Sequence, residues 1–188
     1  MTTMAIGEAE LWKLSYYRVC ELTGALFLGR LARTVKDADL RVYFTEQFAE
    51  EARHAWLWTD AIRRLGASPL PIRETYQSIY GRLAGRPTRL LDILACTKVF
   101  EDRVLVYFRS ELERPELHPL VAETITAILG EEEGHSDGMG HFLEQYALRE
   151  GRPAVEEALA RYRQLDERAF ELVRPYLDRP WDALHLDL

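Results

Sequence analysis

The chain has 188 residues, of which 47% are hydrophobic and 29% charged, with 24 basic side chains against 31 acidic ones. This length and composition fit one globular domain with a real hydrophobic core and exclude a disordered chain. The net charge of −7 argues against broad attraction to nucleic acid or to anionic membranes. We therefore expect a single domain over residues 1–188, with no membrane association and no nucleic-acid partner.

The two cysteines, Cys20 and Cys96, form no Cys-x-x-Cys motif and give no disulfide framework, which excludes zinc-ribbon and rubredoxin-type sites. The first residues lack the basic segment and the apolar run of a signal peptide. No stretch approaches the about 20 apolar residues that a membrane span needs. A reducing cytoplasm is the expected location.

Apolar residues recur with helical periodicity along nearly the whole chain, and no segment alternates like a strand. The spacing predicts a first helix from about Gly7 to Thr34, then a tight turn at residues 36–39. A second helix runs to Gly66, which is well placed as its C-terminal cap. A long connection with several prolines follows and is expected to hold a short helix at about residues 74–83.

A third helix is predicted to begin after Thr88 as its N-cap and to end before Pro115. A fourth covers residues 119–150, and a fifth runs from residue 153 to about 176, followed by a tail. The order is helix, turn, helix, long connection, helix, turn, helix. It predicts an all-α four-helix bundle over residues 8–150, with one long crossover between its second and third helices. Residues 153–188 add an extra C-terminal helix and the tail.

Two tetrapeptides of the form Glu-x-x-His stand out, one at Glu51 to His54 and one at Glu132 to His135. On a helix, this spacing puts the carboxylate and the imidazole on one face, one turn apart. The helical neighbours of both pairs are mostly apolar, so both faces are expected to be buried. A buried carboxylate without compensation is costly. Around Glu51 these neighbours are Phe44, Phe48, Ala55, Trp58 and Ile62.

The other two long helices each carry one more carboxylate in an apolar stripe, Glu21 and Glu101. Glu21 and Glu51 are 30 positions apart, and the midpoint between them falls on the predicted turn at residues 36–39. Glu101 and Glu132 are 31 apart, and their midpoint falls beside Pro115. Residues equidistant from the turn of an antiparallel hairpin lie at the same height, so all four glutamates can meet at one level.

Four carboxylates and two imidazoles at one level make a dinuclear site for iron or manganese. At these residues the sequence resembles the ferritin-like di-iron carboxylate superfamily, over about residues 8–150. Within it, the short hairpins are similar to those of the rubrerythrin-like and tRNA-hydroxylating non-haem di-iron oxygenases. Val104 stands where rubrerythrins carry a further glutamate, and no rubredoxin domain is present. The resemblance assigns as metal ligands Glu21, Glu51, His54, Glu101, Glu132 and His135.

This resemblance implies an oxidoreductase, a di-iron monooxygenase or oxidase that activates O₂ to hydroxylate or oxidise a small organic or modified-nucleoside substrate. Two iron ions are expected, with Mn/Fe and Mn/Mn left open. An external electron donor such as a ferredoxin or a reductase would be required. A rubrerythrin-like peroxide scavenger and a ferroxidase or iron-storage protein are the alternatives. The amphipathic fifth helix suits docking on its own bundle or formation of a homodimer.

Residues one turn from the ligands are candidates for further roles. Thr97 precedes Glu101 by one turn and is assigned either a catalytic hydrogen bond at the metals or a bond to its own backbone. Tyr17 precedes Glu21 by one turn. It either donates a hydrogen bond to a metal ligand, donates an electron, or packs in the core with its hydroxyl satisfied. Gly134, Gly138 and Gly140 in the fourth helix are expected to allow close helix packing, with a π-bulge beside the second metal pair as the alternative. The walls of a substrate pocket are predicted to be Gly24, Ala25, Trp58, Val104 and Phe108.

Overall fold

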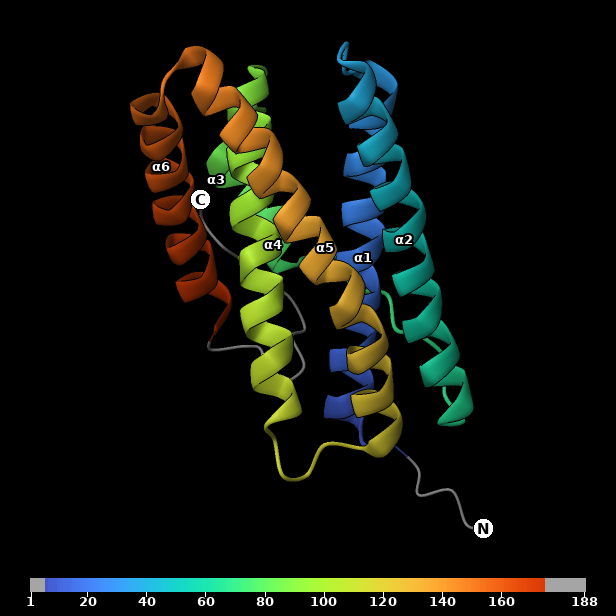
Figure 1. Ribbon diagram of the computed structural model, residues 1–188. Coiled ribbons are helices and arrows are strands. Elements are labelled where there is room, and N and C mark those ends of the chain that lie inside the picture. Colours follow the sequence, from blue (N-terminus) through green and yellow to red (C-terminus); the bar gives the residue numbers. More distant parts are fainter. Residues whose placement is uncertain (1–5, 175–188) are drawn as a thin grey trace. The chain divides into compact units, whose positions relative to one another are not determined.

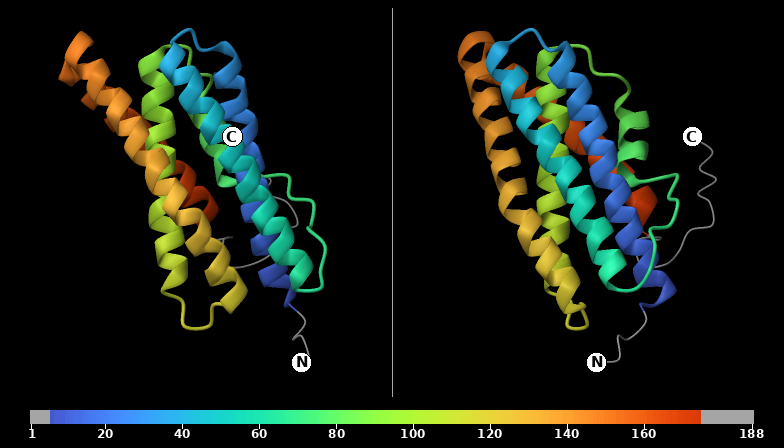
Figure 2. Two further views of the ribbon diagram at one scale, coloured as in Figure 1. Left: turned by 45° about the vertical axis from the view of Figure 1, so that its right-hand side comes forward. Right: turned by 90° about the vertical axis from the view of Figure 1, so that its right-hand side faces the viewer.

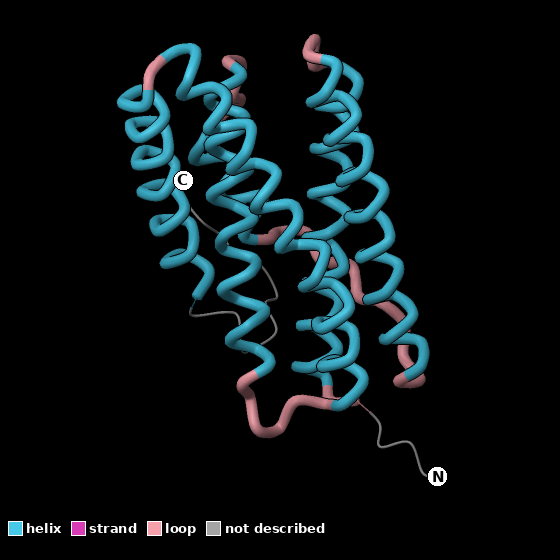
Figure 3. The backbone as a smooth tube through the Cα atoms, viewed as in Figure 1, coloured by secondary structure: helices cyan, strands magenta, loops and turns pink. Residues whose placement is uncertain are grey.

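The computed structural model describes residues 6–174, which form helices and connecting segments without any strand in that range (Figures 1 and 3). The all-α prediction is confirmed for these residues. None of the helices they form combines the length and the apolar character needed to cross a membrane. The helices are α1 (Glu8–Thr34), α2 (Ala38–Arg64), α3 (Tyr76–Ala84), α4 (Leu90–Leu112), α5 (Pro119–Glu150) and α6 (Arg152–Val173).

The contacts between residues divide the described chain into two compact units. The first contains residues 6–79 together with 173–174, and the second contains residues 80–172. Each unit is built around one long helix hairpin. The single domain expected over residues 1–188 stays a prediction, and the tail at 175–188 lies outside the described residues.

The hairpin of the first unit consists of α1 and α2, which lie side by side in opposite directions (Figures 1 and 2). Asp37 caps α2, because its Oδ1 accepts hydrogen bonds of 3.0 Å from the backbone N–H groups of Asp39 and Leu40. Gly66 follows the end of α2 with a φ of +78°, a left-handed conformation that favours glycine. The predicted turn and C-terminal cap are both confirmed, within two residues.

The connection after α2 returns along α1. Ser15 Oγ accepts a hydrogen bond of 2.9 Å from the backbone N–H of Leu70, and the Tyr16 hydroxyl accepts one of 2.8 Å from that of Tyr76. Tyr76 is the first residue of α3, so the short helix predicted at residues 74–83 is present. The two bonds hold the beginning of α3 against the first hairpin.

The hairpin of the second unit consists of α4 and α5 (Figure 1). The ring Nδ1 of His118 accepts a hydrogen bond of 3.1 Å from the backbone N–H of Leu120, and proline follows at the first helical position. Gly151 ends α5 with a φ of +100°. The prediction for residues 119–150 is therefore confirmed. The predicted N-cap of α4 is wrong by one residue, because Arg89 occupies that position and its side chain makes no capping bond.

Helix α6 docks on α4 within the second unit. Asp166 is buried and accepts hydrogen bonds from the Arg103 guanidinium, which also lies 4.6 Å from the centre of the Phe170 ring. A second link joins Arg161 to Asp92. Docking on its own hairpin was one of the two uses expected for this helix. The homodimer stays a prediction.

Candidate metal centre

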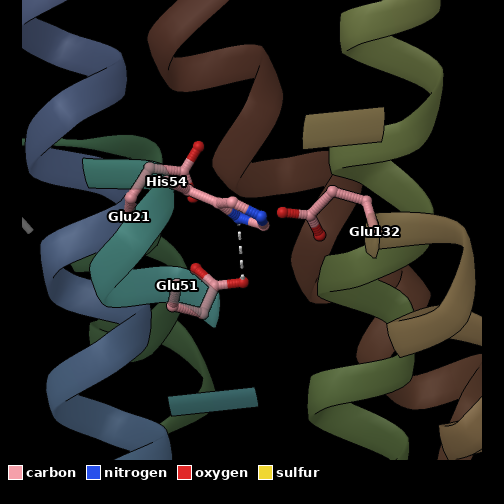
Figure 4. A group of neighbouring side chains, drawn as sticks. All are labelled: Glu21, Glu51, His54 and Glu132. Atoms are coloured by element: carbon pink, nitrogen blue, oxygen red, sulfur yellow. Dashed lines mark ion pairs between the residues drawn. The ribbon is translucent and has the colours of Figure 1, made fainter. Parts of the chain in front are cut away.

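The first hairpin buries three potential metal ligands: Glu21 from α1, and Glu51 and His54 from α2. In this order, the three residues are 4%, 3% and 0% exposed. One ligand atom from each lies within 4.8 Å of the other two. Figure 4 shows these three residues, and its dashed line marks the 4.0 Å ion pair between His54 Nδ1 and Glu51 Oε1. The fourth side chain drawn there, Glu132, belongs to the second unit. We call these three residues the first half-site.

The second hairpin repeats the arrangement with Glu101 from α4, and Glu132 and His135 from α5. These residues are 2%, 1% and 3% exposed, and their ligand atoms again lie within 4.8 Å of one another. His135 Nδ1 is 3.4 Å from Glu132 Oε2. These residues form the second half-site. Each half-site therefore has two carboxylates and one imidazole on buried helix faces.

The chemistry of each half-site fits a metal ion. At metal–ligand distances of about 2.0–2.2 Å, two ligands of one ion lie roughly 3–4 Å apart, which matches both His–Glu separations. Two ionised carboxylates in one buried site repel each other, and a bound cation offsets both this repulsion and their desolvation. Oxygen and imidazole donors suit iron, manganese and zinc alike, so the donors do not fix which metal binds. The buried Glu/His groups can hold metal ions.

Trp58 supports the first half-site directly. Its indole Nε1 donates a hydrogen bond of 3.2 Å to Glu21 Oε1, and Trp58 itself is fully buried. Tyr17 packs on the Trp58 ring with the ring centres 5.0 Å apart. The sequence predicted Trp58 as a pocket wall and Tyr17 as a neighbour of Glu21. The role of Trp58 as a donor to a ligand was not predicted.

Gly24 faces the other carboxylate of the first half-site. A Cβ at this position would lie 2.7 Å from Glu51 Oε2 and 3.7 Å from Nε2 of Gln77 on α3. The Glu51 carboxylate therefore lies directly beside this glycine, and Ala25 next to it is buried. Gln77 was missed by sequence reasoning, because nothing in the pattern of α3 indicates that it reaches the hairpin.

The remaining candidates lie on α4 around Glu101. Thr97 is buried and its hydroxyl donates a hydrogen bond of 2.9 Å to the carbonyl of Ile93, the backbone bond that was one of its two interpretations. Phe108 is buried and Val104 is half-buried. Gly24, Ala25 and Trp58 belong to the first unit, and the α4 residues to the second. The five-residue substrate pocket stays a prediction.

A polar cluster next to the second half-site was also missed. Lys98 Nζ donates to Asp102 Oδ1 at 2.5 Å and to Ser136 Oγ at 2.9 Å, and Ser136 donates to Asp102 at 2.7 Å. Asp102 follows Glu101 in the sequence, and Ser136 follows His135. The cluster therefore ties α4 to α5 at the level of their ligands. We call it the Lys98–Asp102–Ser136 cluster.

Neither cysteine adds a thiolate to the site at neutral pH. Burial raises the pKa of the Cys20 thiol well above its ordinary value, helped by the Glu21 and Glu51 carboxylates and opposed by hydrogen bonds with Tyr16 and Thr75. Burial likewise raises the pKa of the Cys96 thiol to about 11. Both thiols therefore stay protonated and poorly reactive.

Two predictions about packing near the ligands are wrong. Phe48, expected on the buried face with Glu51, is 40% exposed, and its ring lies over Gly29 of α1, where a Cβ would be 3.1 Å away. Of the glycines of α5 expected to allow close packing, Gly134 has no neighbour within 4 Å of the position of a Cβ, whereas at Gly140 a Cβ would lie 3.7 Å from Lys98 Cε. The helical phase of α5 is nevertheless as predicted, since Glu132 is buried and Glu133 is exposed.

No protein-family model matches this chain, and no curated protein or solved structure matches it either. The assignment of the site therefore depends on the residues and distances of the chain itself.

Proposed function

We propose that this chain is a non-haem di-iron oxidoreductase that uses O₂ to hydroxylate or oxidise a small organic or modified-nucleoside substrate. One observation carries the proposal: each of two helix hairpins brings two carboxylates and one histidine within 4.8 Å of one another on buried faces. Two iron ions would be held by Glu21, Glu51, His54, Glu101, Glu132 and His135. The resemblance to ferritin-like di-iron proteins supplies the reaction class.

The proposal includes one shared centre rather than two separate sites. Its support is the matching composition of the two half-sites and the matching distance of their glutamates from each hairpin turn. Hairpins of this kind, joined by a long crossover, would pack as a four-helix bundle of the ferritin type. The six residues named above would then hold both ions in that one centre.

The residues of the chain have defined tasks in this proposal. Bound iron supplies one-electron redox chemistry and a place for O₂ to react. Trp58 holds the Glu21 carboxylate in one orientation, and Gly24 leaves the room that the Glu51 carboxylate occupies. The buried apolar residues around both half-sites exclude water. Electrons would come from an external donor such as a ferredoxin or a reductase.

The deciding experiment is metal analysis of the full chain after reconstitution with ferrous iron under argon, followed by desalting. About two ions per chain are expected. Glu51→Gln and Glu132→Gln keep the shape of each side chain and remove its charge. Glu46→Gln on α2 and Glu133→Gln on α5 are matched controls, because both glutamates are exposed on the same helices.

In a shared centre, either ligand variant lowers the affinity for both ions, and the controls keep two. Loss of one ion in each variant would show two independent mononuclear sites and contradict the shared centre. A wild-type chain that takes up no iron would contradict the whole proposal. Spin coupling between the two ions in an electron paramagnetic resonance spectrum gives a separate test of their proximity.

The reaction class is tested with the iron-loaded chain. An oxygenase consumes O₂ in the presence of a reductant and couples that consumption to substrate. Rapid turnover of peroxide without substrate would instead favour the scavenger. Oxidation and retention of many iron ions per chain would favour storage. Gel filtration of the same sample then reports whether the chain forms the predicted homodimer or a many-subunit cage.

A further inference from the structure

Four aromatic side chains in the first unit form a continuous row. The Trp12 and Tyr16 rings stack with centres 5.3 Å apart, Tyr16 and Tyr17 lie 6.3 Å apart, and Tyr17 and Trp58 lie 5.0 Å apart. All three separations fall in the range of direct aromatic contact. None of the four residues is more than 5% exposed. We call this row the aromatic chain.

One end of the aromatic chain contacts a metal ligand. The Trp58 indole donates its hydrogen bond to Glu21 Oε1. The other end, Trp12, is nine positions before Glu21 on α1, which corresponds to about 14 Å along the helix. The row therefore leads from the level of the ligands to the first turns of α1, through side chains that touch.

The composition of the row is chemically specific. Tryptophan and tyrosine lose one electron far more easily than phenylalanine or aliphatic residues, and every member of this row is one of the two. Other aromatic pairs, such as Tyr43–Phe44 and Tyr107–Phe108, include a phenylalanine and would interrupt such a path. The Glu21 carboxylate beside Trp58 also stabilises a positive charge on the indole.

We propose that Trp58, Tyr17, Tyr16 and Trp12 carry oxidising equivalents away from the metal centre when O₂ has reacted there without substrate. The proposal rests on the proposed function for its oxidant, which is the oxidised metal centre. A low-molecular-weight thiol is the final reductant. The aromatic chain thus protects Glu21 and its neighbours from oxidation during unproductive turnover.

The electrons and protons balance at each step. Trp58 gives one electron to the oxidised centre, which is reduced by one unit. Tyr17 then reduces the oxidised Trp58 by one electron, Tyr16 reduces Tyr17, and Trp12 reduces Tyr16. Each tyrosine releases its phenolic proton to solvent as it loses an electron, and takes a proton back from solvent when it is reduced again. The thiol reduces Trp12 and releases one proton, and two thiyl radicals combine to one disulfide.

The first test uses the iron-loaded full chain, mixed with O₂ without substrate or reductant, frozen rapidly and examined by electron paramagnetic resonance. Iron content and O₂ uptake are measured in the same sample. Without a thiol the oxidation comes to rest on the tyrosines, because a neutral tyrosyl radical forms more easily than the radical of Trp12. The wild type and Trp56→Phe, which changes a 54% exposed residue of α2, are therefore expected to give a tyrosyl signal. Tyr17→Phe keeps the Trp58–Glu21 bond and is expected to lose that signal and show a tryptophanyl radical instead. An unchanged tyrosyl signal in Tyr17→Phe, or O₂ uptake without any aromatic radical in the wild type, would overturn the proposal.

The second test needs no metal, so it separates failure of the aromatic chain from failure of the proposed function. In a Trp56→Phe, Trp181→Phe background, the tryptophans that remain are Trp12 and Trp58. Azide radicals produced by pulse radiolysis oxidise tryptophan, and the tryptophanyl absorbance should convert to tyrosyl absorbance at a rate independent of protein concentration. Adding Tyr16→Phe and Tyr17→Phe should abolish this conversion. Persistence of the conversion at the same rate would overturn the proposal even if the chain binds no iron.

Discussion

The indole N–H of Trp58 donates a hydrogen bond of 3.2 Å to the Glu21 carboxylate, between two side chains that are almost completely buried. This bond joins α2 to α1 at a residue that we assign as a metal ligand. A buried carboxylate with a fixed donor has one preferred orientation, so the first half-site is partly organised by the chain alone. Trp58 is also the first member of the aromatic chain, so the same residue positions Glu21 and takes part in the proposed electron transfer.

Trp58→Phe removes the hydrogen bond and leaves most of the apolar volume in place. We expect the metal-free chain to lose about 1–3 kcal/mol of unfolding free energy, because the Glu21 carboxylate stays buried without this donor. Metal affinity at the first half-site should fall roughly 10–100-fold. Urea unfolding and competition with a chelating dye measure the two effects. Trp56→Phe, at an exposed position two residues earlier, should change stability by less than about 0.5 kcal/mol. Equal losses in both variants would contradict this role for Trp58.

Gly24→Ala should weaken metal binding, and Gly134→Ala should not. In a helix, Gly→Ala normally stabilises by about 0.5–1 kcal/mol. At Gly24 the added Cβ would stand 2.7 Å from Glu51 Oε2, so the carboxylate must move from its position beside His54. At Gly134 an added Cβ would have no neighbour within 4 Å, although this residue lies between Glu132 and His135 in the sequence. Metal titration and thermal unfolding of the pair compare these effects. Undiminished metal affinity in Gly24→Ala would show that Glu51 does not need its observed orientation.

The sequence predicted the helices and the buried ligands well, because both depend on local periodicity. Turn and cap residues such as Asp37 and Gly151 act within a few positions of the helix ends they define. Glu51 and His54 share a face simply because they are one turn apart. Agreement at this level requires no knowledge of how one helix is rotated against another.

The residues that sequence reasoning missed depend on contacts between helices. Trp58 reaches Glu21 only because α1 and α2 have a particular register and rotation, and Gln77 is brought to Gly24 by the bonds that hold α3 against α1. Phe48 satisfied the periodic pattern of a buried residue but lies over Gly29 at the edge of the contact. An apolar stripe predicted from spacing is wider than the face that actually packs. Such details follow from tertiary structure alone.

Ser136→Ala tests the Lys98–Asp102–Ser136 cluster. The change removes two hydrogen bonds between α4 and α5 and keeps the Lys98–Asp102 ion pair, so we expect a loss of about 1–2 kcal/mol in unfolding free energy. Glu133→Gln breaks the exposed ion pair with Arg109 on the same two helices and should cost at most about 0.5 kcal/mol. Urea unfolding measures the loss of unfolding free energy in each variant. A Ser136→Ala loss no larger than that of the surface pair would show that the cluster does not stabilise the hairpin.

Cys96 should make the stability of the chain fall in alkaline solution. Burial raises the pKa of its thiol from the ordinary value of 9.0 to about 11, so the folded chain retains a proton that the unfolded chain releases.

The contribution of the protonated Cys96 thiol is fully present below pH 9 and is lost as the pH rises from 9 to 11, amounting to roughly 2–3 kcal/mol. Cys96→Ala lacks the titrating group and should lose less stability over the same interval. Urea unfolding at pH 8 and pH 10.5 for both proteins isolates the effect, because all other titrating groups are common to the two. Parallel pH profiles would mean that the Cys96 thiol titrates alike in the folded and unfolded chain, contrary to its burial in the folded chain.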